Sequence, residues 1–109
     1  MKNKICVLNY ESGNVGSVFN MLQFMGYESI ISNDENEIKN STHIILPGVG
    51  SFGNAMKKIR SLVPLKILEN EVFNKKKPFL GICVGMQVLA NKGFEHGEHT
   101  GLGWIEGSV

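Results

Sequence analysis

Four short apolar runs, separated by segments with helical spacing, constrain the fold of this chain more than any other feature. The runs occupy residues 5–8, 27–32, 43–46 and 79–82. They read as apolar runs rather than as strict alternations of apolar and polar residues, which is typical of strands buried on both faces of a parallel sheet. The strand order along the chain therefore indicates an α/β fold in which helices cover a parallel sheet.

The segments between the runs predict the helices. One helix is expected over residues 15–25, ended by Gly26, and others over 54–62, after Pro64, and around 86–90. The polar segment 33–40 is compatible with a loop or a short helix. Three consecutive lysines, residues 75–77, are expected at a solvated helix end, where cations suit the negative pole of the helix dipole.

Composition limits the class of protein. The chain has 109 residues, of which 42% are hydrophobic, which suits one small globular domain. Its formal net charge of +1 gives no electrostatic footprint for nucleic acid. No segment approaches the about 20 apolar residues of a membrane span. The two cysteines, Cys6 and Cys83, are not a disulfide framework, so we expect a protein of the reducing cytoplasm.

The turns that follow the first, third and fourth runs are the candidate site. They cover residues 9–14, 47–53 and 81–85. Reactive groups of open parallel sheets gather at the carboxyl ends of the strands, where these turns lie. We therefore expect the functional side chains of this protein to meet at that edge.

Cys83 is the candidate nucleophile. Gly81-Ile82-Cys83-Val84-Gly85 has the spacing of a G-x-S-x-G nucleophile elbow with sulfur in place of oxygen. In such a turn the central residue is strained, its glycine neighbours avoid clashes, and its side chain projects above the sheet. The positive end of the following helix would favour a thiolate. The alternative is a small buried cysteine in a tight glycine turn.

The turn "LPGVGSFG" also fits a dinucleotide-binding pattern, through Gly48, Gly50 and Gly53. Two features oppose that interpretation: the turn follows the third run rather than the first, and the acidic residues about 20 positions later, Glu69 and Glu71, fall in a predicted helix. We expect no cofactor. Backbone N–H groups in this turn could instead join that of the residue after Cys83 in an oxyanion hole.

Two motifs together resemble the class I glutamine amidotransferases. These are "LPGVGSFGNAM" and, about thirty residues later, "PFLGICVGMQVLA". The turn Y-x-x-G-N at residues 10–14 and "GLGWIEGSV" near the end are most similar to the glutaminase subunits of imidazole glycerol phosphate synthases. The resemblance covers essentially the whole chain. It implies that residues 1–109 are the amino-terminal part of a single, incomplete domain with the family's flavodoxin-like fold.

The resemblance also implies a chemistry. Cys83 would attack the side-chain amide of glutamine, form a glutamyl thioester and release ammonia to a synthase subunit in a heterodimer, without metal or cofactor. The implied residues are Val84 with Val49 or Gly50 for the oxyanion hole, Gly48, Gln87 and Glu95 for glutamine, and Asn14 at the partner interface. Gln87 could otherwise be a solvated helix residue, and Glu95 an ordinary loop acid.

Other interpretations stay open. Asn9 and Glu11 depart from the "D-Y-G-M-G-N" more common in the histidine-pathway enzymes, and residues 90–104 are similar to paralogues that serve surface-sugar biosynthesis. Histidine biosynthesis is nevertheless the favoured pathway. A non-catalytic flavodoxin-like module with an inert Cys83, or another cysteine hydrolase with the same elbow, is the alternative from a different class.

No histidine of this chain is a good candidate for the general base. In the family that base is a histidine with a glutamate two residues beyond it, in a half of the domain absent here. His43 starts a strand, which puts it about 10 Å from the reactive edge. His96 and His99 follow the last predicted helix, and this H-x-x-H has no further metal ligands at suitable spacing. We therefore expect the 109 residues alone to be inactive.

Overall fold

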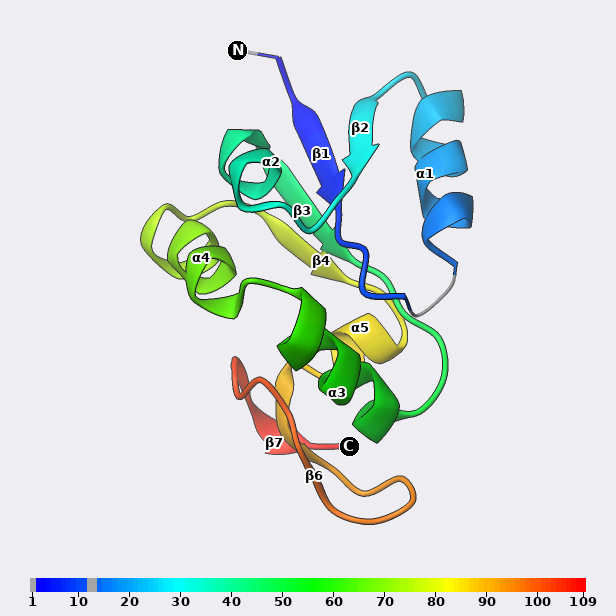
Figure 1. Cartoon of the computed structure of the whole chain (residues 1–109), viewed down its shortest axis with the longest axis vertical. Helices are drawn as coiled ribbons and strands as arrows, with labels where there is room; N and C mark the ends of the chain where they lie inside the picture. The colour runs from blue at the N-terminus through cyan, green and yellow to red at the C-terminus, as the bar shows by residue number, and fades with distance from the viewer. Residues whose placement is uncertain (1, 12–13) are drawn as a thin grey trace.

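The computed structural model describes residues 2–11 and 14–109 and contains a four-stranded sheet in which all neighbouring strands are parallel (Figure 1). Its strands lie within or next to the four predicted runs, and their order in space is β2-β1-β3-β4. They are β1 (Lys4–Val7), β2 (Glu28–Ile31), β3 (His43–Leu46) and β4 (Phe79–Gly81). The predicted parallel α/β sheet is confirmed.

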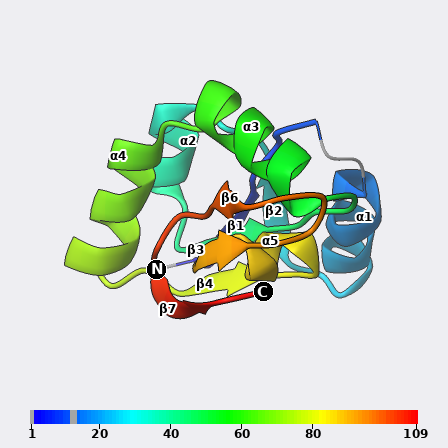
Figure 2. The ribbon, with the colours of Figure 1, turned by 90° about the horizontal axis from the view of Figure 1, so that it is seen from below.

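Helices cover both faces of this sheet. They are α1 (Val15–Phe24), α2 (Glu35–Asn40), α3 (Phe52–Leu62), α4 (Leu65–Glu69) with the π-helical turn η1 (Asn70–Asn74), and α5 (Val84–Gln87). In Figure 2, α2, α3 and α4 lie together on one side of the sheet. On the other face, Val7 and Ile45 form a separate apolar cluster with residues of α1. None of the described helices is long and apolar enough to cross a membrane.

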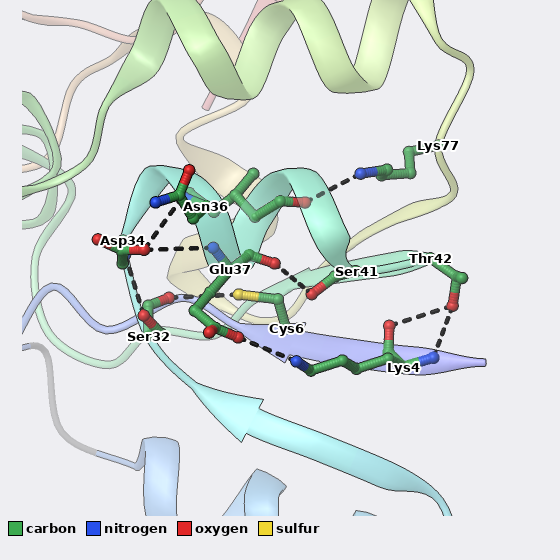
Figure 3. Close-up of polar contacts among 10 residues, drawn as sticks. Lys4, Cys6, Ser32, Asp34, Asn36, Glu37, Ser41, Thr42 and Lys77 are labelled. Carbon is green, nitrogen blue, oxygen red and sulfur yellow. Dashed lines mark hydrogen bonds and ion pairs between the residues drawn. The ribbon is translucent and has the colours of Figure 1, made fainter. Parts of the chain in front are cut away.

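The polar segment after β2 forms the short helix α2, one of the two predicted outcomes. The Asp34 carboxylate caps it by accepting hydrogen bonds from the N–H groups of Asn36 and Glu37, at 3.0 and 3.3 Å (Figure 3). Beneath α2, the buried Cys6 thiol donates to the carbonyl of Ser32 at 3.3 Å. Burial raises the pKa of this thiol to about 11, so Cys6 is a core residue rather than a nucleophile.

A second, three-stranded sheet corrects the expected helix around residues 86–90. Helix α5 ends at Gln87, and Ala90 already belongs to β5 (Ala90–Gly93), which pairs with β6 (His99–Thr100) and in parallel with β7 (Ile105–Ser108). The segment after α5 is bonded to a later part of the chain and pairs as a strand: the carbonyls of Val88, Leu89 and Ala90 accept N–H groups from residues 102, 105 and 103, at 2.8, 2.9 and 3.1 Å.

Helix α3 anchors this second sheet. The Arg60 guanidinium donates to the carbonyls of Thr100 and Gly101 at 3.0 and 3.3 Å. The buried Phe52 ring packs against Gly93 so closely that a Cβ there would lie 2.5 Å from it. The hairpin between β5 and β6 is thereby held over the first turn of α3, next to the edge where the strands of the main sheet end.

A buried ion network joins η1 to α2. The fully buried Glu71 carboxylate lies 2.6 Å from Lys77 Nζ and 2.9 Å from Lys75 Nζ, and Lys77 also donates to the carbonyls of Ile38 and Lys39 at 2.9 Å. The expectation of a solvated lysine run is therefore wrong for Lys77, whose side chain is only 12% exposed. Burial raises the pKa of Glu71, but hydrogen bonds from both lysines outweigh burial and hold that pKa below its ordinary value.

Glu71 should make stability depend on pH. Because its pKa is lowered by folding, the carboxylate contributes stability that is fully present above the ordinary value of 4.5 and is lost as pH falls through the lowered folded value. We expect Glu71→Gln to unfold at lower urea concentration at pH 7 and to lose less stability on acidification. Urea unfolding between pH 7 and pH 3 tests this, with the exposed Glu106→Gln as control. Parallel pH profiles for wild type and Glu71→Gln would contradict it.

Candidate active site around Cys83

Cys83 lies in a strained turn between β4 and α5, as predicted. Its backbone has φ 54° and ψ −121°, a region that residues with a side chain rarely occupy, and its thiol side chain is exposed. The N–H groups of Met86 and Gln87 both donate to the Cys83 carbonyl, at 2.9 and 3.1 Å. The first turn of α5 therefore fixes the cysteine in this conformation.

The glycines on either side of Cys83 are required by backbone contacts. A Cβ on Gly81 would lie 2.6 Å from the Gly85 carbonyl oxygen, and a Cβ on Gly85 would lie 1.9 Å from the Leu46 carbonyl oxygen. Both distances are far below van der Waals contact, and the obstructing atoms are backbone. Gly85 is thus required where α5 packs against the end of β3, and Gly81 where α5 folds back on β4.

A pocket of about 490 Å³ opens beside Cys83 and brings together the side chains and turns predicted for glutamine binding. Gln87 of α5 and Glu95 of the β5–β6 hairpin line it together with the turn after β3. The lining residues are Gly48, Val49, Gly50, Cys83, Val84, Gln87, Glu95 and Val109. Sequence reasoning missed Val109 because it did not predict β7, which returns the chain beside β5.

The turn after β3 is held by a residue that sequence reasoning also missed. The hydroxyl of the fully buried Tyr10 donates to the Pro47 carbonyl at 2.5 Å and occupies the space where Gly48 would carry a side chain. The chain then turns outward: Val49 is 47% exposed and Gly50 has φ 98°, which favours glycine. The Y-x-x-G-N pattern was the available signal for Tyr10.

Glu95 has a structural contact in addition to its place in the pocket. Its Oε1 accepts a hydrogen bond from the Phe52 N–H at 3.1 Å, in the first turn of α3. That turn is also capped by Ser51, whose hydroxyl accepts from the Asn54 N–H at 3.4 Å. Glu95 is therefore more than an ordinary loop acid, because it joins the hairpin to the helix beside the site.

The other candidate residues lie away from the pocket. Asn14 precedes α1 with φ 65°, while its neighbours Ser12 and Gly13 lie outside the described residues. His43 is the first residue of β3, at the amino end of the sheet, as expected. His96 lies in the β5–β6 hairpin, and the ring of His99 packs against Gly53. Within residues 2–11 and 14–109, no group of three or more His, Cys, Asp or Glu side chains could hold a metal ion.

Comparison with known proteins is consistent with this geometry. The family model described as glutamine amidotransferase class-I matches residues 6–98. A solved structure of a candidate peptidase E from Listeria monocytogenes EGD-e superposes with a TM-score of 0.67 over 83% of this chain and 50% of that one. Its sequence is only 12% identical, so it supports the fold alone.

Curated relatives are more similar in sequence. The imidazole glycerol phosphate synthase subunit HisH of Aquifex aeolicus is 43% identical over 94% of this chain and 50% of its own length. HisH 2 of Methanococcus maripaludis is 45% identical over 93% of this chain and 50% of its own length. HisH of Zymomonas mobilis is 42% identical over 100% of this chain and 55% of its own length. The chain spans about half the length of the curated relatives it matches.

The contact between Gly85 and the Leu46 carbonyl gives a stability prediction. Gly85→Ala must push two backbone segments apart and is expected to lower the free energy of unfolding by about 2 kcal/mol or more. Gly16→Ala is the matched control, because a Cβ there meets nothing within 4 Å and alanine favours helix α1. Urea unfolding of both variants is the measurement. Equal stabilities for the two would show that the elbow is not closely packed.

Proposed function

The chain belongs to the class I glutamine amidotransferases, and we propose that it carries the glutaminase site of an imidazole glycerol phosphate synthase of histidine biosynthesis. The observation that carries the proposal is the exposed, strained Cys83 at the mouth of a pocket that also holds Gln87 and Glu95. The names of the relatives support the histidine pathway over surface-sugar biosynthesis. An exposed cysteine in strained backbone favours a functional site over an inert flavodoxin-like module.

The proposed reaction is acyl transfer through Cys83. Its thiolate sulfur bonds to the amide carbon of the glutamine side chain, and the carbonyl electron pair moves onto oxygen. The backbone N–H of Val84, with that of Val49 or Gly50, stabilises this oxyanion. Collapse of the intermediate breaks the C–N bond, and the amide nitrogen leaves as ammonia after taking a proton. Water then hydrolyses the thioester to glutamate and restores the thiol.

Three groups around the pocket are suited to hold glutamine. Gly48 lines the pocket with backbone alone, and the Gln87 amide lies one helical turn after Cys83, where it can hydrogen-bond the substrate. We assign Glu95 Oε2 to the substrate's α-ammonium group, since Oε1 is bound by the Phe52 N–H. A carboxylate already fixed by one backbone donor is well oriented for such an ion pair.

The ammonia is used by a synthase subunit, so the functional unit in this proposal is a heterodimer. Asn14 and the turn after β1 are assigned to the partner interface, because they lie at the carboxyl edge of the sheet where ammonia must leave. No cofactor or metal is needed for the reaction. The cytoplasm is the proposed location, because a reducing compartment keeps the exposed Cys83 thiol free to react.

Cys83→Ala is the direct test in the complete amidotransferase assembled with its synthase subunit. We expect glutamine-dependent synthesis to fall by at least about 10³-fold, because the covalent intermediate cannot form. Ammonia-dependent synthesis should be unchanged, since the partner supplies that chemistry. Both rates are measured on the same preparation.

The matched control is Cys6→Ala, which removes the other cysteine from the core without touching the pocket. It is expected to keep its glutamine-dependent activity per folded molecule. If Cys83→Ala retained glutamine-dependent synthesis, or lost the ammonia-dependent reaction as well while folded, the proposal would be wrong.

The isolated chain of 109 residues should release glutamate no faster than its Cys83→Ala variant. Among the described residues, no histidine lines the pocket, so no imidazole is placed to protonate the leaving ammonia or activate water. A positioned acid–base group contributes about 10²–10⁴-fold, and groups that act as a unit fail together. Glutamate release is assayed after circular dichroism confirms folding. Turnover above the variant would show that a base within this chain was overlooked.

A further inference from the structure

One dipeptide, Tyr10-Glu11, holds both sides of the turn that carries Val49 and Gly50. Before that turn, the Tyr10 hydroxyl donates to the Pro47 carbonyl at 2.5 Å. After it, Lys58 of α3 donates from Nζ to the Glu11 carbonyl at 2.9 Å. The segment after β1 therefore contacts the start of the turn between β3 and α3 directly, through Tyr10. It also contacts helix α3, which follows the turn, through Lys58.

The contact through Tyr10 is buried and close. Tyr10 and Pro47 are both buried, and a Cβ on Gly48 would lie only 2.0 Å from the Tyr10 hydroxyl. The hydroxyl thus fills the space behind Gly48 as well as satisfying the carbonyl before it. Without the hydroxyl, a buried carbonyl would lose its donor and the turn could move into the vacated space.

The turn has little other support on its outer side. A second pocket, of about 250 Å³, separates Val49 and Gly50 from α3 and is also lined by Ser51, Asn54, Ala55 and Lys58. Val49 and Gly50 are both exposed. Packing on this side leaves the direction of their N–H groups open. Gly48 lies against α5, and Glu95 holds the Phe52 N–H after the turn, so Tyr10 and Lys58 add support from the chain that leaves β1.

We infer that Tyr10 is a positioning residue for the oxyanion hole of this enzyme, with Lys58 as a weaker second support. The inference rests on the proposed function. The Tyr10 hydroxyl acts through the backbone: it fixes the Pro47–Gly50 segment so that an N–H group there faces the oxyanion of the intermediate bonded to Cys83. That N–H group is needed in the transition state more than in the bound substrate, so its misplacement lowers kcat and leaves KM unchanged.

Tyr10→Phe in the complete amidotransferase with its partner tests this, because it removes only the hydroxyl. We expect glutaminase kcat to fall about 10- to 100-fold, since a shift of about 1 Å in an active-site group can lower the rate by about 10². KM for glutamine and the rate at which iodoacetamide alkylates Cys83 should stay within about twofold of wild type. The control is Tyr27→Phe, at the other, half-exposed tyrosine, with unchanged kinetics.

A purely structural role for Tyr10 would give a lower melting temperature with wild-type kcat in the folded enzyme, and that result overturns the inference. A rise in KM with unchanged kcat overturns it too. If Tyr10→Phe fails to fold, the inference is tested with Lys58→Met instead. This variant should lower kcat about 3- to 10-fold at constant KM. Its control is Lys57→Met in the same helix, whose kcat and KM should equal those of wild type. Wild-type kcat in Lys58→Met would then reject the inference.

The proposed function is tested separately in the same assays. An inactive Cys83→Ala together with a fully active Tyr10→Phe would leave the glutaminase proposal standing and remove only the role of Tyr10. A fully active Cys83→Ala would remove both.

Discussion

The contact of Gly85 with the end of β3 determines the site. Because a Cβ at this position would lie 1.9 Å from the Leu46 carbonyl oxygen, the backbone of α5 lies directly against the neighbouring strand. β3 and β4 are adjacent and parallel, so their carboxyl ends open at the same edge. The turn after β3 and the turn that carries Cys83 then have to share one pocket. Cys83 and the backbone groups proposed to stabilise the oxyanion come together through this single approach.

The second sheet completes the pocket by returning the chain beside the end of α5. The carbonyls of residues 88–90 accept N–H groups from residues 102, 103 and 105. These bonds hold the segment after α5 to the chain that comes back through the β5–β6 hairpin. The hairpin places Glu95 over the first turn of α3, and the return strand brings Val109 to the pocket wall. The pocket beside Cys83 therefore depends on α5 ending after one turn.

Much of the fold and the centre of the site could be predicted from the sequence because they depend on local patterns. Apolar runs gave the four strands, and the spacing around Cys83 gave the elbow. The second sheet could not be predicted in this way, because its strands are short and rich in glycine and polar residues. The glycine of the pair His96-Gly97 is a local signal for a hairpin turn, and both residues have positive φ in the structure. The Y-x-x-G-N pattern marks Tyr10, but it does not reveal the Pro47 carbonyl, 37 residues away, to which the Tyr10 hydroxyl donates.

The two cysteines show how position in one sheet decides chemistry. Cys6 lies within β1, fully buried beneath α2, where removal from water raises the pKa of its thiol and leaves it a packing residue. Cys83 lies two residues beyond the end of β4, where the backbone is strained and the thiol faces solvent and the pocket. In a parallel sheet covered by helices, a side chain within a strand faces the core, whereas one just past the carboxyl end faces outward. The chain thus keeps one thiol exposed at the edge of the sheet and one buried inside it without any difference in residue type.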